Sequence, residues 1–229
     1  MPHTLSIIIP VYNEAATIEE LLRRVFMVDL GDWEREVVVV DDGSVDGTPR
    51  LLQEAKKVLD FKLLKHAHNR GKGASVRSGL LVATGQAVLV QDADLEYDPQ
   101  DIPKLLEPFG QGCQAVFGSR MIKHTQGGYP HYILGAKLLT WVINLLFHTK
   151  LTDPYTCYKL IDAEIIKRLQ LEARGFEFEA ELVAKLLRQG GKIVEVGVSY
   201  SPRKFSEGKK IRPRDAYRGL LTIWRVWRS

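Results

Sequence analysis

Three acidic residues at alternate positions, Asp92, Asp94 and Glu96, follow directly after the apolar run 87–90. An apolar run of this length is typical of a buried strand. In an extended chain, side chains two positions apart point the same way, so we expect the three carboxylates to converge. Carboxylate oxygens gathered in this way suit Mg²⁺ or Mn²⁺, which complete their coordination with water and substrate phosphate. For this stretch alone, a solvated acidic loop is the alternative.

The strands that would position these residues come from a repeated strand-then-helix pattern. Apolar runs at 5–11, 37–40 and 61–64 are each followed by a segment with helical spacing of apolar residues, and 87–90 begins the next unit. Three such units in the first 90 residues predict a mostly parallel sheet. We expect Asn13 or Thr17 to cap the first helix, Thr17 together with Glu20 as a capping box. Thr48–Pro49 and Asp98–Pro99 are expected to start later helices.

In a parallel sheet, ligands bind beyond the carboxyl ends of the strands, and residues 10–14, 41–44 and 92–96 all fall there. Alternation places Pro10, Tyr12 and Glu14 on one side, and Val39 and Asp41 on one side. Together they predict a slot for a flat ring with a carboxylate at its edge. Taken alone, Tyr12 is more often a core or rim aromatic, and residues 41–44 are more often a turn with a helix cap. No dinucleotide fingerprint or Walker loop is present.

The second half of the chain offers cations and one amphipathic end. A strand at 114–118 leads to Arg120, whose planar guanidinium near the acidic site suits a diphosphate, with a surface ion pair as the alternative. The helix at 177–189 begins with acids that complement its dipole, although one of them could face the site as a base. The apolar helix at 133–147 is read first as core, with an oligomer contact or a membrane-surface role left open. The terminal segment 214–227 is a basic amphipathic helix that lies on a membrane or covers the domain.

Composition excludes little but sets the scale. The chain has 229 residues, 45% hydrophobic and 26% charged, with a formal net charge of +4, which fits one α/β core with a C-terminal extension. We expect no signal peptide, no membrane-spanning helix and no nucleic-acid partner.

Two cysteines without metal spacing, Cys113 and Cys157, weakly indicate a reduced intracellular setting. A late basic cluster suits a phosphate-bearing ligand or an anionic membrane, with a solvated basic face as the alternative; it comprises Arg203, Lys204, Lys209, Lys210, Arg212, Arg214 and Arg218.

Five motifs in fixed order, residues 8–14, 40–48, 69–73, 92–94 and 117–120, resemble the inverting family 2 glycosyltransferases of the GT-A fold. Within that family the resemblance is greatest to the polyprenyl-phosphate sugar transferases of the dolichyl-phosphate mannose synthase type. The resemblance covers most of the chain, from residue 5 to about residue 210. It implies a Rossmann-like three-layer α/β sandwich with a mostly parallel mixed sheet over residues 1–210, and a basic amphipathic helical extension over 211–229.

The resemblance also implies roles for individual residues. Asp92, Asp94 and Glu96 would hold Mg²⁺ or Mn²⁺, although relatives often have Gln in place of Glu96. Asp94, Arg120 and Asp153 would be catalytic. If the acceptor were a sugar hydroxyl, Asp153 or Glu179 would be the base. The residues expected to bind the nucleotide-sugar are Pro10, Tyr12, Glu14, Val39, Asp41, Asp42, Lys72, Asp92, Ala93, Asp94, Arg120, Arg203 and Lys209.

The reaction implied is metal-dependent transfer of a hexose, with inversion, from a nucleotide-diphosphate sugar of the GDP-mannose or UDP-glucose type. The acceptor would be a polyprenyl (dolichyl or undecaprenyl) phosphate, which is already anionic and needs no strong base. Many relatives continue into transmembrane helices, and no such helix is expected in this sequence. We therefore expect the chain to reach a lipid acceptor as a peripheral protein on the cytoplasmic membrane face, or through a membrane-protein partner. Transfer to a hydroxyl in polysaccharide or glycolipid synthesis, a nucleotidyltransferase and a non-catalytic scaffold remain alternatives.

Overall fold

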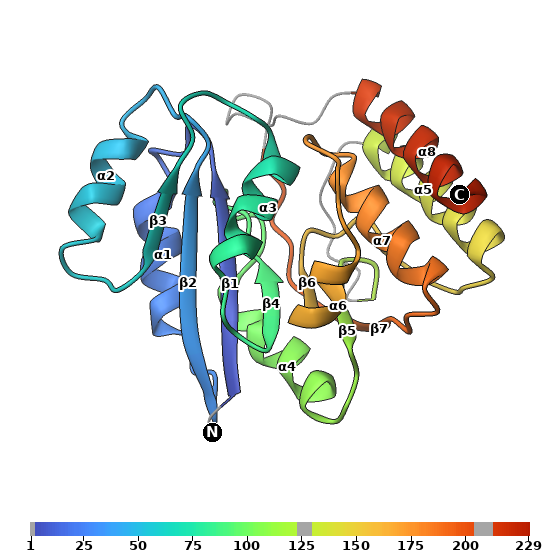
Figure 1. The fold of residues 1–229 in the computed structure, drawn as a ribbon, viewed down its shortest axis with the longest axis horizontal. Coiled ribbons are helices and arrows are strands. Elements are labelled where there is room, and N and C mark those ends of the chain that lie inside the picture. Colours follow the sequence, from blue (N-terminus) through green and yellow to red (C-terminus); the bar gives the residue numbers. More distant parts are fainter. Residues whose placement is uncertain (1–2, 123–129, 204–212) are drawn as a thin grey trace.

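Runs of Ile and Val form the central strands of a seven-stranded sheet in the computed structural model, which describes residues 3–122, 130–203 and 213–229 (Figure 1). Side chains on both faces of these strands are buried, as expected for a sheet with helices on either side. The strand order is β3-β2-β1-β4-β6-β5-β7, and only β6 runs antiparallel to its neighbours. The strands are β1 (His3–Val11), β2 (Trp33–Asp41), β3 (Lys62–Lys65), β4 (Ala87–Val90), β5 (Ala115–Ser119), β6 (Lys159–Asp162) and β7 (Val194–Gly197).

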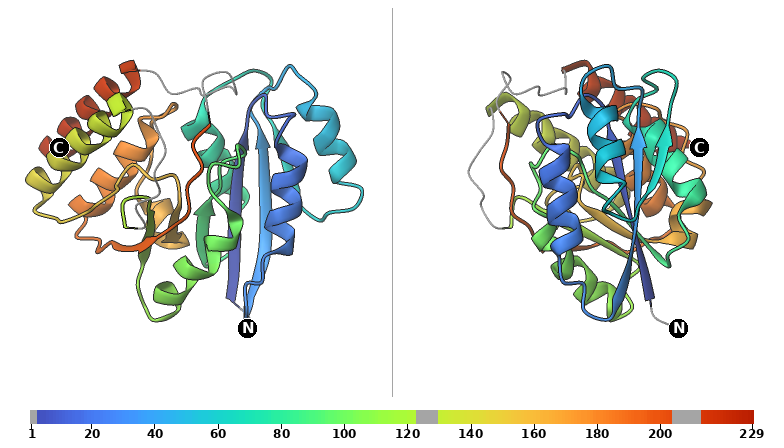
Figure 2. Two further views of the ribbon diagram at one scale, coloured as in Figure 1. Left: turned by 180° about the vertical axis from the view of Figure 1, so that it is seen from behind. Right: turned by 90° about the vertical axis from the view of Figure 1, so that its left-hand side faces the viewer.

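Helices cover both faces of the sheet, so the fold has three layers (Figures 1 and 2). One face carries α1 (Ile18–Met27) and α4 (Ile102–Gly110), which follows a short 3-10 turn at Pro99–Asp101; the other face carries α3 (Lys72–Val82) and α6 (Ala163–Arg168). Helix α2 (Thr48–Ala55) packs against α1 beside the edge strand β3. The core between these layers is continuous from β2 to β5.

Three helices form a second cluster at the end of the molecule beyond β7 and β5. Helix α8 (Pro213–Arg228) lies beside α5 (Pro130–Phe147), and both pack on α7 (Phe178–Arg188) (Figure 1). The terminal helix therefore covers the domain, with Ile223 and Val226 buried. Each of α5 and α8 also keeps an exposed apolar row on its outer side, made of Leu138, Trp141 and Leu145 on α5 and Tyr217, Trp224 and Trp227 on α8.

The parallel sheet and most of the expected elements are confirmed. Two elements were not predicted from the sequence, the antiparallel strand β6 and the short helix α6. The boundary expected at 210/211 lies outside the described residues. None of the helices in the described ranges combines the length and the apolar character that crossing a membrane requires.

The predicted capping box at α1 is wrong. The Thr17 hydroxyl donates to Glu14, while Glu20 pairs with Arg23 and Arg24 on the exposed side of the helix. Helix α2 begins at Thr48, but Gly47 and not Thr48 is its N-cap residue. The Thr48 hydroxyl accepts from the backbone N–H of Glu14, and Thr48 N donates to Asp46. The Asp98–Pro99 start is confirmed, since Asp98 accepts from Gln100 N.

Candidate active site at the carboxyl edge of the sheet

A cavity of about 480 Å³ opens where β1, β2 and β4 end. This volume lies in the range of small-molecule sites, and its position matches the rule for ligands of parallel sheets. Loops far apart in the sequence contribute to its wall, including the segment before α7. The lining residues are Pro10, Val11, Tyr12, Glu14, Asp42, Asn69, Gly71, Lys72, Ser75, Asp92, Ala93, Asp94, Glu96, Gly175, Phe176 and Arg203.

The loops after β1 and β2 are fastened to each other by hydrogen bonds. Asn13 has a positive φ of 52°, its N–H donates to Ser44 Oγ, and its side-chain oxygen accepts from Val45 N. Asn is one of the few residues that adopt this backbone region readily. The pair of loops therefore forms one rigid rim on which Tyr12 and Glu14 face the cavity.

The acidic residues after β4 sit in a turn, so the extended-chain prediction for this segment is wrong. Leu95 has a φ of 60°, and the N–H of Glu96 donates to Asp94 Oδ1 at 3.1 Å. A non-glycine residue in the left-handed region is uncommon and is often associated with functional sites. The turn carries Asp92, Asp94 and Glu96 to the cavity, and the Glu96 carboxylate also accepts from the Tyr200 hydroxyl and from Arg203 N.

Arg203 closes one side of the cavity by bridging acids from two strand ends. Its guanidinium lies 2.9 Å from Glu14 Oε2 and 3.0 Å from Asp94 Oδ2. Burial raises the pKa of Asp94 to about 7, and the nearby charges of Asp92 and Glu96 add to this effect while Arg203 opposes it. A raised pKa means that the environment destabilises the ionised form of Asp94. A bound cation would stabilise that ionised form.

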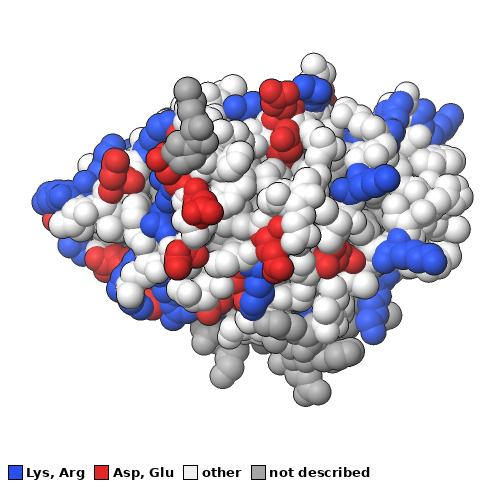
Figure 3. Space-filling model, turned by 90° about the horizontal axis from the view of Figure 1, so that it is seen from below, with Lys and Arg blue, Asp and Glu red and all other residues white. Residues whose placement is uncertain are grey.

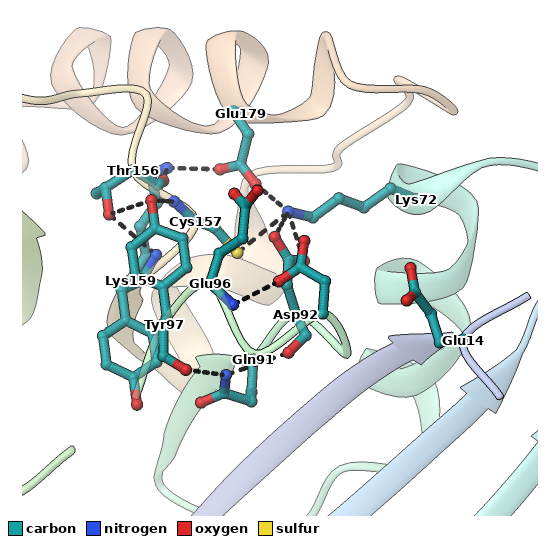
Figure 4. A network of polar contacts seen from close by, with 12 residues as sticks. Glu14, Lys72, Gln91, Asp92, Glu96, Tyr97, Thr156, Cys157, Lys159 and Glu179 are labelled. Atoms are coloured by element: carbon teal, nitrogen blue, oxygen red, sulfur yellow. Dashed lines mark hydrogen bonds and ion pairs between the residues drawn. The ribbon is translucent and has the colours of Figure 1, made fainter. Parts of the chain in front are cut away.

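Lys72, the first residue of α3, also lines the cavity and belongs to a largely buried cluster of charged residues (Figure 4). Its ammonium is 2.8 Å from Asp92 Oδ1, 3.0 Å from Glu179 Oε1 and 3.2 Å from Cys157 Sγ. Burial disfavours the charged form of Lys72, but these neighbours outweigh it and raise its pKa well above the usual range. Glu179 is in turn paired with Lys159, which is 2% exposed.

A second buried acid, Asp42, shapes the loop that leads into α3. Its carboxylate accepts from the N–H groups of Arg70 and Gly71 and lies 2.6 Å from His66 Nδ1. Gly71 has a φ of 96°, and a Cβ at this position would come within 2.4 Å of Arg174 O. Only glycine fits this close approach, which sets the loop before α7 against the N-terminus of α3.

Arg120 and Asp153 are bound to each other one layer behind the cavity. Arg120 Nε and Nη2 donate to the Asp153 carboxylate at 2.6 and 2.7 Å, and the guanidinium packs 5.0 Å from the centre of the Tyr200 ring. The pair is buried and bidentate, so the guanidinium is aimed at Asp153 instead of the acidic turn. The alternative expected from the sequence, a surface ion pair, is therefore wrong in one respect, because the ion pair with Asp153 is largely buried.

The structure thus brings together most of the expected site residues. Those that line the cavity are Pro10, Tyr12, Glu14, Asp42, Lys72, Asp92, Ala93, Asp94, Glu96 and Arg203. Val39 is buried inside the sheet, Asp41 caps the following turn through Ser44 N, and neither lines the cavity; Lys209 lies outside the described residues. Sequence reasoning missed Asn69, Ser75 and Phe176 in the lining and Lys159 behind it. A lysine inside the otherwise apolar run Tyr158–Ile161 was the available signal for Lys159.

Two carboxylates in this site fit a divalent cation. Among the described residues, no three Asp, Glu, His or Cys side chains are already grouped as metal ligands. Glu96 lines the cavity with Asp92 and Asp94, but its carboxylate accepts from the Tyr200 hydroxyl and from Arg203 N. Asp92 and Asp94 line the same cavity, and each is now balanced by a cation of the chain itself. A Mg²⁺ or Mn²⁺ ion that takes two protein carboxylates completes its coordination with phosphate and water, which suits this donor set.

Comparison with known proteins identifies relatives over nearly the whole chain. The model of glycosyl transferase family 2 matches residues 6–169. A dolichol-phosphate mannosyltransferase from Pyrococcus furiosus is 31% identical over 229 residues, which covers 97% of this chain and 63% of that protein. An undecaprenyl-phosphate 4-deoxy-4-formamido-L-arabinose transferase from Aeromonas hydrophila is 40% identical over 115 residues, covering 49% of this chain and 35% of that protein. The chain thus spans less than two thirds of the length of these two relatives.

Solved structures with the same architecture come from Mycobacterium tuberculosis. Glucosyl-3-phosphoglycerate synthase in complex with Mn²⁺, UDP and glucosyl-3-phosphoglycerate superposes with a TM-score of 0.76 at 20% identity, covering 98% of this chain and 80% of that one. The same enzyme with Mg²⁺ and UDP gives a TM-score of 0.74 at 21% identity, covering 98% and 79%. This likeness establishes the GT-A fold for the chain, and it shows that neighbours of this fold bind either metal together with a nucleoside diphosphate.

Proposed function

Because this chain belongs to glycosyl transferase family 2, we propose that it transfers a hexose from a nucleotide-diphosphate sugar to a polyprenyl phosphate and inverts the anomeric centre. The donor is of the GDP-mannose or UDP-glucose type. The names of the two sequence relatives, both sugar transferases of polyprenyl phosphates, support this acceptor class.

The lining of the cavity supports the donor half of the proposal. Pro10 and Tyr12 offer an apolar wall for the nucleoside, and the acids of the β4 turn and Arg203 line the same cavity. Asp92 and Asp94 would hold Mg²⁺ or Mn²⁺. When bound, the cation neutralises charge that builds up on the departing diphosphate. Arg203, already in the cavity, binds the phosphate oxygens with its planar fork.

The state of the two candidate bases carries the choice of acceptor. A hydroxyl acceptor needs a carboxylate that can take a proton, and the candidates are Asp153 and Glu179. Asp153 is held bidentately by Arg120. Burial opposes ionisation of Glu179, but Lys159 and Lys72 outweigh burial and lower its pKa, which weakens it as a base. A phosphate monoester, with a second pKa of about 6, is already a nucleophilic anion and needs no such base.

The outer side of α5 and α8 supports a peripheral membrane contact. The exposed apolar rows of these helices include Trp141, Trp224 and Trp227. Helix α5 carries no acidic residue, and α8 has Arg225 and Arg228 in its last turn. In Figure 3 the end of the molecule that holds these helices shows Lys and Arg among uncharged surface, whereas at the opposite end Lys and Arg are mixed with Asp and Glu. Tryptophan with basic residues is the combination favoured at anionic bilayer surfaces.

A donor and acceptor panel tests this function. The purified chain is incubated with GDP-mannose or UDP-glucose, with Mn²⁺ or Mg²⁺, and with or without a short-chain polyprenyl phosphate. We expect a polyprenyl-phosphate hexose and a nucleoside diphosphate, detected by mass spectrometry, with inverted anomeric configuration by NMR. Release of pyrophosphate would identify a nucleotidyltransferase, and transfer to a sugar hydroxyl alone would refute the lipid-phosphate acceptor. If no donor binds and no turnover occurs under any of these conditions, the proposed glycosyltransferase activity is wrong.

A further inference from the structure

Four charged residues form a continuous buried chain from the cavity to the helical cluster (Figure 4). In order they are Asp92, Lys72, Glu179 and Lys159, and their side chains are 22%, 11%, 8% and 2% exposed. Asp92 follows β4, Lys72 begins α3, Glu179 is in the first turn of α7 and Lys159 begins β6. The row of charges therefore connects the proposed metal ligand Asp92 with β6, the strand that runs antiparallel to its neighbours.

The two ends of this chain are held differently. Lys159 is fixed, because its ammonium donates both to Thr156 O and to Glu179 Oε2, the latter at 2.5 Å. The other oxygen, Glu179 Oε1, is buried and makes no hydrogen bond among the described residues, although Lys72 Nζ lies 3.0 Å away. Lys72 instead donates to Asp92 Oδ2 at 3.1 Å, with Oδ1 at 2.8 Å. Lys72 thus forms an ion pair with Glu179 Oε1 whose geometry falls short of a well-aligned hydrogen bond.

A divalent cation on Asp92 changes this balance. An ammonium and a metal ion on the same carboxylate repel each other at short distance, and the repulsion is strong where water is scarce. Lys72 cannot move into the interior without a counterion, because an unpaired buried charge is costly. Glu179 supplies a counterion, and Lys159 keeps it in place. A small shift of the Lys72 ammonium is enough, since both carboxylates already lie near it.

We propose that Lys72 is a shared cation that lies on Asp92 in the metal-free protein and transfers to Glu179 when a divalent cation binds. Glu179, oriented by Lys159, is then a positioning residue that makes Asp92 available to the metal. This inference rests on the proposed function, since it takes Asp92 as a metal ligand. Because Glu179 stands on the helix that packs against α5 and α8, the transfer also links metal binding to the N-terminus of α7.

Mn²⁺ binding to the metal-free chain, measured by electron paramagnetic resonance of the free ion, tests the proposal. Glu179→Gln leaves Lys72 with Asp92 as its acid partner in this cluster, so we expect about tenfold weaker Mn²⁺ binding. Lys72→Met removes the competing cation, so binding should be at least as tight as in the wild type. In the Lys72→Met background, Glu179→Gln should change the affinity by no more than about twofold.

The coupling between the two substitutions separates this proposal from a merely structural or long-range electrostatic role of Glu179. Either of those roles predicts the same loss for Glu179→Gln with and without Lys72, and that result would overturn the proposal. Glu181→Gln is the matched control: Glu181 is buried in the same helix but accepts from Glu172 N and Ala173 N. We expect Glu181→Gln to leave Mn²⁺ affinity within about twofold of the wild type.

A crystal structure of the wild-type protein with Mn²⁺ gives a second test that does not depend on any variant folding. We expect Lys72 Nζ to donate to Glu179 Oε1 and to have left Asp92. If Lys72 stays on Asp92 beside the bound metal, the shared-cation proposal is wrong and the proposed glycosyltransferase function stands. If the wild type binds no Mn²⁺ at all, the metal part of the proposed function fails instead, so the two failures are distinguishable.

Discussion

At the ends of β1 and β4, the carboxylates of Glu14, Asp92 and Asp94 line an open cavity. Beside β5 and β6, in contrast, the charges of Arg120 and Lys159 are sealed in buried pairs with Asp153 and Glu179. Both regions pair acids with cations of the chain, but the acids of the parallel half of the sheet, β1 to β4, line the cavity, and the pairs beside β5 and β6 do not. Under the proposed function, the donor chemistry would lie in the parallel half, and the second half would supply rigid support.

The largest effect is expected from removing an acid of the open half. Asp92→Asn takes away a ligand of the proposed metal and should lower kcat about 1000-fold with any donor. Mn²⁺ binding should be lost in parallel, measured on the same protein. Asp60→Asn, an exposed acid at the start of the β3 unit, is the control and should leave both unchanged. If Asp92→Asn still binds Mn²⁺, Asp92 is not a metal ligand, and the acids that line the cavity do not differ in this respect from the sealed pairs.

Breaking a sealed pair should affect stability more than metal binding. Arg120→Met leaves the Asp153 carboxylate buried without its bidentate partner, so we expect the free energy of unfolding to fall by about 3–5 kcal/mol in urea titrations. The double variant Arg120→Met/Asp153→Asn should recover a large part of this loss, since it removes the stranded charge. The folded fraction of either variant should keep wild-type Mn²⁺ affinity; a loss there would assign Arg120 to the metal and donor site.

The pH dependence of stability should distinguish the open acids from the sealed ones. The pKa of Asp94 is raised from 3.8 to about 7 in the folded protein, first by burial and then by Asp92 and Glu96. The folded state thus binds the proton more tightly than the unfolded chain, so Asp94 stabilises the metal-free fold at acidic pH. That contribution is lost as pH rises from about 4 to about 7. The shift corresponds to about 4 kcal/mol, and loss of the ion pair with Arg203 offsets part of it. Asp94→Asn should therefore raise the free energy of unfolding at pH 8 by about 2 kcal/mol, and an unchanged or lower value would contradict the shift.

The smallest effect concerns the surface of the helical cluster. Replacing Trp141 and Trp224 together by Ser should weaken sedimentation with anionic phospholipid vesicles by about tenfold, and added salt should weaken it further. Val58→Ser is the matched control, because Val58 is 82% exposed but lies on the parallel half. Turnover with a short-chain acceptor free in solution should stay at the wild-type rate. Equal vesicle binding by all three proteins would show that exposed apolar side chains on the two halves do not differ.

Much of the parallel half could be predicted from the sequence because its signals are local. The apolar strands, the helical spacing between them and the polar residues at strand ends each lie within a few neighbouring positions, and the rule that strand ends share an edge joins them. The cavity lining at Tyr12, Glu14, Asp92 and Asp94 follows from this reasoning.

The remainder depended on contacts that no local pattern encodes. The turn at Leu95 replaces the extended geometry assumed for the acidic stretch. Arg120 was placed correctly after β5, but its direction is decided by Asp153, which lies on a distant loop. The pairing of Lys159 with Glu179 joins β6 to α7, and β6 itself was missed because a four-residue strand with one lysine resembles an ordinary loop boundary.

The antiparallel strand β6 has a consequence for the order in which the chain can fold during synthesis. It pairs with β4 through Ala87↔Asp162 and Leu89↔Leu160, so it occupies the edge next to strands that leave the ribosome much earlier. Until residue 162 has emerged, the nascent protein carries an apolar strand edge open to pairing with other chains. Chaperone binding to stalled nascent chains should therefore drop sharply once β6 is released. Strand β4, whose end leads into the acidic turn, is made early, but its outer edge is covered only when β6 arrives.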